Sequence, residues 1–175
     1  MAEVIEGKYL GKDLRMGIVV SRFNELITKA MLEGALNELR RFGVSDTNLH
    51  VVWVPGAYEI PFACQTLCQT KPLDALIAIG CIIRGETNHY EHIAQSVCDG
   101  IQKVALERNI PIGLGVLTVE HMAQAFDRAG GKQGNKGREA ARSSVEMVQL
   151  VRELESRQER EVRLKQLMEQ EFKKR

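Results

Sequence analysis

Four apolar segments alternate with amphipathic, helix-like segments along this chain, and this alternation limits the folds that the chain can adopt. The apolar segments are residues 15–20, 49–54, 74–83 and 111–119. They are continuously apolar, which is typical of strands covered on both faces. Helical patterns occupy residues 25–42, 59–70, 89–108, 120–128 and 137 onward. This order predicts a three-layer α/β/α sandwich built on a four-stranded parallel sheet.

Residues at the helix ends support this interpretation. We expect Asn24 to cap the first helix and Gly43 to end it, because asparagine can accept from free backbone N–H groups and glycine tolerates the left-handed conformation. Pro61 is compatible with the first turn of the second helix.

The composition argues against several classes of function. A formal net charge of +1 and an aromatic content of 5% do not indicate nucleic-acid binding. No apolar segment approaches the length of a membrane span, and the first 16 residues lack the apolar core of a signal peptide. We therefore expect a cytoplasmic protein, or a plastid one if a transit peptide has been removed. The cysteines are expected to be reduced, mostly buried thiols: Cys64, Cys68, Cys81 and Cys98.

The two ends of the chain differ from the rest. Residues 1–13 are predicted to form a strand or arm without a partner in the same chain. We predict a main domain over residues 1–155 and a charged helical extension over residues 156–175. The favoured interpretation of the extension is a solvated helix end, and the alternative is a contact between subunits.

Ligands of open parallel sheets bind beyond the carboxyl ends of the strands. Three segments at such positions are richer in polar, glycine and aromatic residues than a minimal turn needs. They are residues 21–24, 55–59 and 84–89. Phe23, in the first of them, either fills the core or covers a flat ring.

The third segment predicts an anion site. Asn88 and Glu91 have the spacing of a capped helix start, and the free N–H groups there, with Gly85 to Thr87, can hold a phosphate. His89 at the first helical position can accept and donate a proton. The alternative is an ordinary helix start with a surface histidine.

Metal and nucleotide motifs are not indicated. His89, His92 and Cys98 lack a second cluster with ligand spacing, so we predict no metal site. The glycine-rich residues 130–137 lack the spacing of a nucleotide-binding loop and are predicted to be a flexible connection. They bring three cations close together as a possible counter-charge for phosphate: Arg128, Lys132 and Lys136.

Five segments together closely resemble the lumazine synthase family, in the family's order and spacing. They are Ser21–Asn24, Val54–Pro61, Gly80–Glu91, Gly115–Thr118 and Ala129–Gly137. The resemblance covers about residues 1–155. It implies condensation of 5-amino-6-(D-ribitylamino)uracil with 3,4-dihydroxy-2-butanone 4-phosphate. The products would be 6,7-dimethyl-8-ribityllumazine, phosphate and water, in the penultimate step of riboflavin biosynthesis, with no metal or organic cofactor.

The resemblance also implies roles for single residues. His89 would transfer protons and Arg128 would pair with the phosphate. Glu86, Thr87 and Lys136 would lie at the phosphate too. The residues that would bind the pyrimidine ring and ribityl chain are Phe23, Ala57, Tyr58, Glu59, Cys81, Ile82, Ile83 and Leu114.

Position 114 is a departure from the family, which often has an aromatic residue there. We expect altered affinity for the ring rather than loss of activity.

The resemblance further implies a homo-oligomer. Family members form pentamers, many of which stack into a hollow icosahedral shell, and the absence of an insertion in residues 130–137 favours the shell. The site would lie between adjacent subunits, with Leu114, Arg128 and Lys136 supplied by the neighbour. The N-terminal arm would add a strand to a neighbouring sheet. The alternatives are a carrier that binds flavin or lumazine without turnover and a shell-forming scaffold.

Overall fold

The computed structural model describes residues 2–173, and the side chains of all of these except residues 164, 165 and 167–173. Its centre is a sheet of four parallel strands in the order β2-β1-β3-β4. The strands are β1 (Met16–Ser21), β2 (Leu49–Val54), β3 (Ala75–Ile83) and β4 (Ile112–Val119). The predicted fold class is confirmed.

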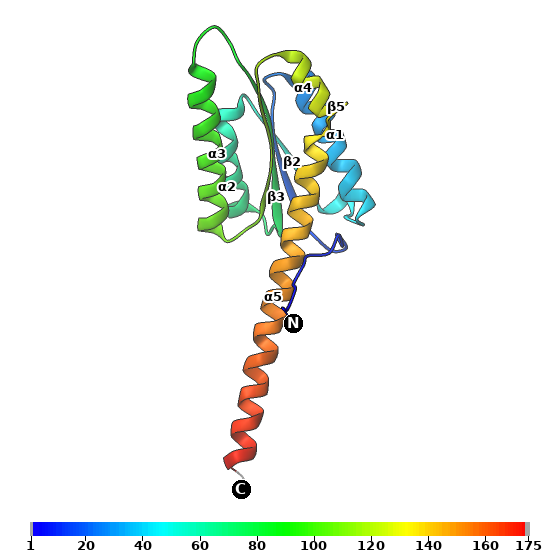
Figure 1. The fold of residues 1–175 in the computed structure, drawn as a ribbon, viewed down its shortest axis with the longest axis vertical. Coiled ribbons are helices and arrows are strands. Elements are labelled where there is room, and N and C mark those ends of the chain that lie inside the picture. Colours follow the sequence, from blue (N-terminus) through cyan, green and yellow to red (C-terminus); the bar gives the residue numbers. More distant parts are fainter. Residues whose placement is uncertain (1, 174–175) are drawn as a thin grey trace.

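Helices cover both faces of this sheet (Figure 1). One face carries α1 (Glu25–Arg41), α4 (Met122–Arg128) and α5 (Lys136–Lys173), and the other carries α2 (Ile60–Thr70) and α3 (His89–Arg108). Each face has its own apolar core, so the sheet is the middle of three layers. None of the described helices combines the length and apolar composition of a membrane span.

Burial differs between central and edge strands. All of β1 and nearly all of β3 are buried, as the continuous apolar patterns predict. β2 is mostly half-buried, and β4 alternates between buried and more exposed residues. The two edge strands are therefore less completely buried than their continuous apolar patterns predict.

The first helix ends as predicted but begins differently. Gly43 has a φ of 90°, and the N–H groups of Gly43 and Val44 donate to the carbonyls of Arg40 and Leu39. Asn24 is itself left-handed, with a φ of 59°, and its side-chain amide donates to the Cys81 carbonyl instead of capping α1. Pro61 lies in the first turn of α2, as predicted.

The glycine-rich segment after α4 is ordered, which corrects the prediction of a flexible connection. It forms a small antiparallel hairpin of β5 (Ala129–Gly131) and β6 (Gly134–Asn135). Residues 129 and 135 pair at the base of this hairpin, directly between α4 and α5. The pairing of the two short strands and the buried Asn135 at the end of β6 hold this segment in place, although its glycine-rich composition suggests mobility.

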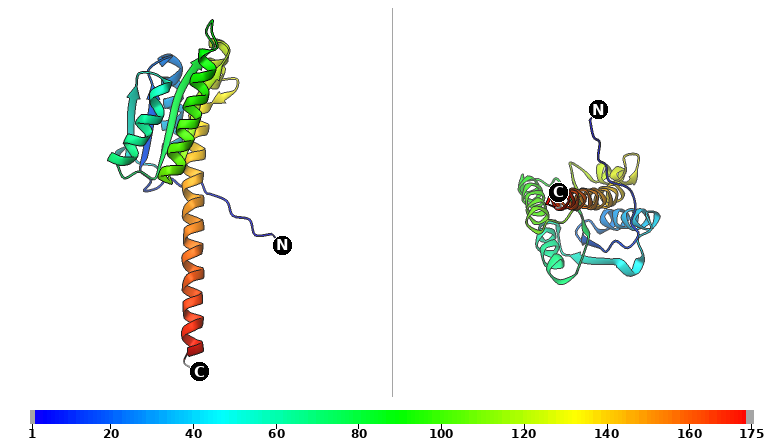
Figure 2. Two further views of the ribbon diagram at one scale, coloured as in Figure 1. Left: turned by 90° about the vertical axis from the view of Figure 1, so that its left-hand side faces the viewer. Right: turned by 90° about the horizontal axis from the view of Figure 1, so that it is seen from below.

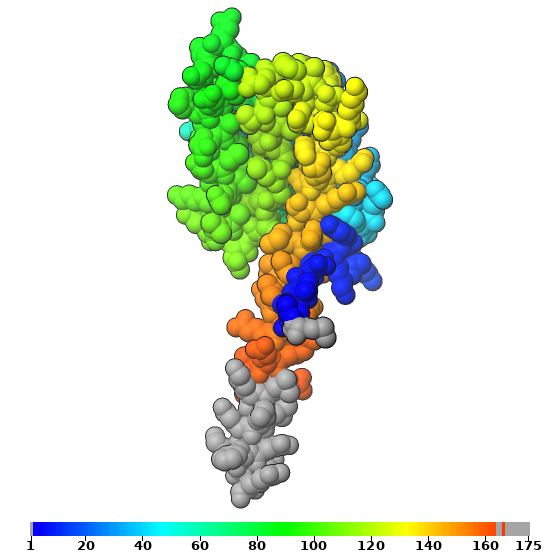
Figure 3. Space-filling view, viewed as in Figure 1, coloured from blue at the N-terminus to red at the C-terminus, as the bar shows by residue number. Residues whose placement is uncertain are grey.

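The N-terminal arm contacts α5 rather than the sheet. The Tyr9 hydroxyl donates to the Glu146 carboxylate at 3.0 Å, and the Gln149 side chain donates to the Leu10 carbonyl at 2.6 Å. Residues 2–10 are extended and form no strand with other described residues. Figure 3 shows the arm against the helix. Its strand pairing with a neighbour stays a prediction.

The last helix continues far beyond the sheet (Figure 2). α5 has 38 residues, which corresponds to roughly 57 Å at 1.5 Å per residue. It crosses the predicted boundary at 155/156 without interruption, and that boundary stays a prediction.

Candidate functional site

The strand order places a ligand site between β1 and β3. From β1 the chain moves to β2 on one side, and later to β3 on the other, so the loops after these two strands diverge at the carboxyl edge of the sheet. A cavity of about 380 Å³ lies there. It is lined by Phe23, Gly56, Ala57, Tyr58, Cys81, Ile82, Ile83, Gly85, Thr87, His89, Tyr90 and Ile93.

The loop that carries Phe23 is fixed at three points. The Thr28 hydroxyl donates to the Ser21 carbonyl at 2.8 Å, and the backbone N–H of Phe23 donates to the Pro55 carbonyl at 3.1 Å. The Asn24 amide donates to the Cys81 carbonyl at 2.9 Å. Phe23 itself is 70% exposed, so it does not fill the core. Its ring is held at the rim of the cavity, where a flat ligand can stack on it.

The second wall is a short turn before α2. Residues Ala57–Glu59 form a single 3-10 turn, and the Glu59 carboxylate accepts from the backbone N–H of Gly56 at 2.9 Å. Ala57 is buried and Tyr58 is exposed. The Glu59 bond fixes the turn through one oxygen and leaves the other available to a ligand hydroxyl.

The cavity floor is the end of β3. Cys81 and Ile82 are buried there, and burial raises the pKa of the Cys81 thiol to about 11. At neutral pH this thiol is therefore protonated and uncharged. The floor offers a ligand apolar surface and the backbone groups beyond the last strand pair.

The far end of the cavity is the beginning of α3. This helix begins at His89, as predicted, and the Thr87 hydroxyl accepts from the backbone N–H of His89 at 3.4 Å. Asn88 occupies the N-cap position, as predicted, but its side chain makes no capping hydrogen bond, and the contact with the His89 N–H comes from Thr87 instead. Free N–H groups of the first turn carry partial positive charge and suit an anion.

An ion pair beside the cavity joins the ends of β3 and β4. The Arg84 guanidinium donates to the Glu120 carboxylate at 2.9 Å and lies 5.6 Å from the centre of the Tyr90 ring. The guanidinium holds the pKa of Glu120 below its usual value. The pair fixes the loop before His89 and neutralises Arg84. Sequence reasoning missed this pair, since 36 residues separate its members and no local pattern links them.

The structure brings together eight of the predicted site residues as lining of the cavity: Phe23, Ala57, Tyr58, Cys81, Ile82, Ile83, Thr87 and His89. Glu59 and Glu86 do not line the cavity: both are exposed, Glu59 at the end of the 3-10 turn and Glu86 in the loop before α3. The remaining three predicted residues do not line this cavity: Leu114, Arg128 and Lys136.

These three residues lie on the side of the molecule formed by β4, α4 and α5. Leu114 is 51% exposed on edge strand β4. The Arg128 guanidinium donates to the Gln124 carbonyl at 3.2 Å, and the Lys136 ammonium pairs with Glu139. Arg128 and Lys136 flank the hairpin on either side, so its pairing brings their backbones together, whereas Lys132, the third predicted cation, lies in the turn between the two strands.

Metal-ligating side chains do not cluster in the described part of the chain. No group of three or more His, Cys, Asp or Glu side chains there could hold a metal ion. All four cysteines are free thiols.

The comparison with protein families identifies the chain. A family model for 6,7-dimethyl-8-ribityllumazine synthase matches residues 13–152. The matched range contains every strand of the sheet, every residue that lines the cavity and the hairpin with its flanking cations. The chain therefore belongs to the 6,7-dimethyl-8-ribityllumazine synthase family, the transferases that make lumazine in riboflavin biosynthesis.

Proposed function

We propose that this protein condenses 5-amino-6-(D-ribitylamino)uracil with 3,4-dihydroxy-2-butanone 4-phosphate, giving 6,7-dimethyl-8-ribityllumazine, phosphate and water. The observation that carries the proposal is the cavity at the β1/β3 carboxyl edge, which has an exposed aromatic ring at one end and His89 at a helix start at the other. The two ends suit the two substrates.

The Phe23 end suits the ribitylaminouracil. A pyrimidine ring can stack on Phe23 and meet the backbone groups of residues 57–58 and 81–83. The free carboxylate oxygen of Glu59 can accept from a ribityl hydroxyl. An apolar floor with a protonated Cys81 excludes charge from the ring subsite, which suits an uncharged heterocycle.

The α3 end suits the phosphate of the second substrate. The Thr87 hydroxyl, the first-turn N–H groups and the backbone at Glu86 can donate to its oxygens. Among the residues that line the cavity, however, there is no lysine or arginine. Because a phosphate dianion gains most from charge-assisted bonds, we propose that Arg128 and Lys136 of an adjacent subunit complete the site.

His89 is the proposed proton-transfer residue. The amine of one substrate attacks the ketone of the other, so protons leave nitrogen and return to oxygen as water is lost. An imidazole that lines the same cavity can serve both transfers. Phosphate departure is stabilised by the helix start and Arg128, and holding both substrates in one cavity supplies much of the rate.

The first experiment is a fluorescence assay of lumazine formation from the two purified substrates without added metal. We expect product well above the spontaneous rate. The His89→Ala variant should lose about 10²-fold or more in kcat and keep its affinity for the ring compound. A wild-type protein that binds the ring compound without accelerating the reaction would instead be a lumazine carrier.

We also propose that the protein assembles as a pentamer and that pentamers stack into a shell. The cavity without lining cations supports an assembly in which a neighbour completes each site. The exposed backbone edge of β2 is open to a neighbour's N-terminal arm. Light scattering of the purified protein tests the shell, because a particle of pentamer size at high concentration contradicts it.

A further inference from the structure

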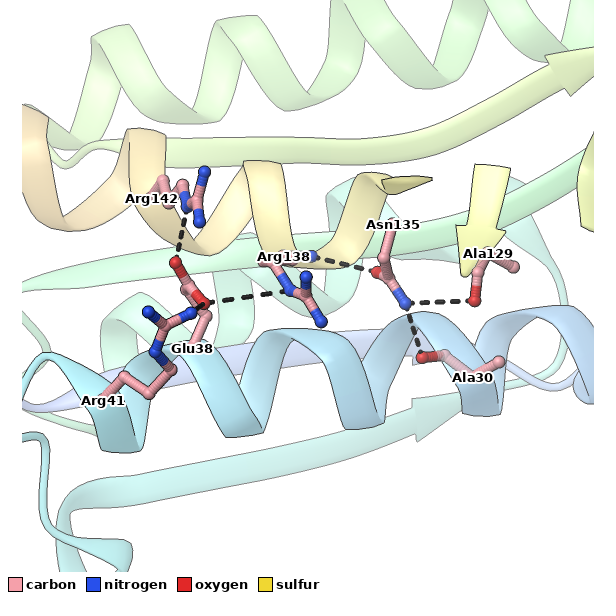
Figure 4. Close-up of polar contacts among 7 residues, drawn as sticks. All are labelled: Ala30, Glu38, Arg41, Ala129, Asn135, Arg138 and Arg142. Carbon is pink, nitrogen blue, oxygen red and sulfur yellow. Dashed lines mark hydrogen bonds and ion pairs between the residues drawn. The ribbon is translucent and has the colours of Figure 1, made fainter. Parts of the chain in front are cut away.

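We infer that Asn135 is a positioning residue for phosphate recognition, which holds Arg128 and Lys136 in place by fastening the β5–β6 hairpin and the start of α5 onto α1. This inference rests on the proposed function, which assigns those two cations to the phosphate. Figure 4 shows the contacts that carry it.

Asn135 uses its amide group on three separate elements. The Nδ2 atom donates to the Ala30 carbonyl of α1 at 2.9 Å and to the Ala129 carbonyl of β5 at 3.1 Å. The Oδ1 atom accepts from the backbone N–H of Arg138 at 3.1 Å. Arg138 is the third residue of α5, so Asn135 also caps this helix.

The side chain is closely enclosed. Asn135 is only 8% exposed. It packs against Gly34 of α1 so tightly that a Cβ atom on Gly34 would lie 2.4 Å from the Asn135 side chain. No alanine fits there unless the asparagine moves. A buried amide that uses both donors and one acceptor fixes the backbone around it more tightly than apolar contact does.

These hydrogen bonds determine where the backbones of Arg128 and Lys136 lie. Arg128 immediately precedes Ala129 and Lys136 immediately follows Asn135, and residues 129 and 135 are paired. The bond from Asn135 to Ala129 therefore joins the backbones that carry both side chains. The bond to Ala30 sets their position relative to α1. The Asn135 side chain is uncharged, so it acts through these hydrogen bonds alone.

A second contact on the same pair of helices provides a matched control. Glu38 of α1 is buried and meets three arginines: Arg142 at 2.5 Å, Arg41 at 3.2 Å and Arg138 at 3.8 Å. Its shortest pair, with Arg142, joins α1 to α5 one turn beyond Arg138, and none of its three ion pairs involves a residue of the hairpin (Figure 4). Loss of this cluster weakens the helix pair without a direct effect on Arg128.

The test compares Asn135→Asp, Gly34→Ala and Glu38→Gln. In N135D the cap acceptor remains, but both donors are lost and an oxygen faces the carbonyls of Ala30 and Ala129. We expect the KM for the butanone phosphate to rise about tenfold or more, with the KM for the ribitylaminouracil changed less than about twofold. G34A displaces the same side chain and should give the same split even if N135D does not fold. E38Q should lower the thermal midpoint and leave both KM values unchanged.

Three results overturn the inference. The first is equal KM values for the phosphate substrate in N135D, G34A and wild type, and the second is an equal rise of both KM values. The same rise in E38Q also overturns it, because that would be a general effect of the helix pair. If the wild-type protein makes no lumazine, the proposed function fails separately. The inference then depends on calorimetric binding of inorganic phosphate, which N135D must weaken about tenfold.

Discussion

At the residue scale, Leu114 occupies the position where the resemblance to the family leads us to expect an aromatic side chain more often. It is 51% exposed on an edge strand, so a larger side chain there meets little steric resistance. In the proposed assembly it faces the ring subsite of the neighbour. We expect Leu114→Phe to lower the KM for the ribitylaminouracil severalfold, because an aromatic face adds about 0.5–1.5 kcal/mol of stacking. This KM is measured by steady-state kinetics with saturating butanone phosphate. A raised KM in Leu114→Phe contradicts the assignment of Leu114 to the binding of the pyrimidine ring.

The buried Cys64 thiol should make the free energy of unfolding depend on pH in the alkaline range. Burial raises the pKa of its thiol to about 12 from an ordinary value of 9.0. Between these values the unfolded chain loses the proton and the folded protein keeps it. The free energy of unfolding therefore falls as the pH rises above 9, by at most ~1.4 kcal/mol per pH unit for this thiol.

Urea unfolding at pH 8 and pH 10.5 under reducing conditions checks this effect. Cys64→Ala should be less stable than wild type at pH 8, because it leaves a small cavity. It should then lose less stability than wild type on going to pH 10.5. Cys98→Ala, which removes a half-buried thiol, is the comparison. An equal alkaline loss in wild type and Cys64→Ala excludes a contribution from the buried thiol.

The residue scale also shows where sequence reasoning ends. Chemical type and position beyond a strand end indicated Thr87 and His89 as site residues but left Phe23 open between the core and a ligand ring; all three line the cavity. The roles of Asn24 and Asn135 were not predictable, because an asparagine amide can cap a helix or bind a distant carbonyl. The partner of Asn24 lies 57 residues away, and Asn135 binds Ala30, 105 residues away, as well as the nearby Ala129 and Arg138. Only the folded chain decides between those bonds.

At the element scale, the strands and long helices follow from the sequence because each has a sustained pattern. The predicted bounds of the four strands and of α1 and α3 agree with the structure to within one residue. The β5–β6 hairpin could not be predicted from the sequence, because its strands have only three and two residues and little apolar surface. Tertiary hydrogen bonds, not local propensity, order that segment.

The loop between β1 and α1 provides a prediction at this scale. Thr28 is fully buried and its hydroxyl donates to the Ser21 carbonyl, which fixes the loop that carries Phe23. Thr28→Val removes that bond at nearly constant volume and should cost about 1 kcal/mol of stability. We expect the KM for the ribitylaminouracil to rise severalfold as the loop loosens.

Thr66→Val is the matched control for this variant. The Thr66 hydroxyl also donates to a backbone carbonyl, that of Phe62 within α2, but it does not line the cavity. Its KM should equal that of wild type in the same assay. If Thr28→Val also leaves the KM unchanged, the buried hydroxyl stabilises the fold without setting the position of Phe23.

At the scale of the whole molecule, the part of α5 beyond the sheet is separable from the site. The family match ends at residue 152, and the described contacts beyond it include the pair of Arg157 with Glu3 of the N-terminal arm. We expect a chain that ends at residue 155 to keep wild-type kcat and particle size in activity assays and light scattering. Loss of assembly would instead make the extension a contact between subunits.

The division of the proposed site between two subunits makes the sharpest prediction for the assembly. His89 lines the cavity, whereas Arg128 lies on α4 away from it. Assemblies of His89→Ala alone or of Arg128→Ala alone should have little activity, because every site lacks one group. When the two variants are co-expressed in equal amounts and assemble at random, about one quarter of the sites combine an intact His89 with an intact Arg128 from the neighbour. Activity should recover to about that fraction of wild type.

A site formed within one subunit predicts no recovery at any mixing ratio, since each chain carries one lesion. Purification through a tag on only one variant confirms that the assayed particles contain both chains, so that an absence of recovery counts against the shared site and not against mixing.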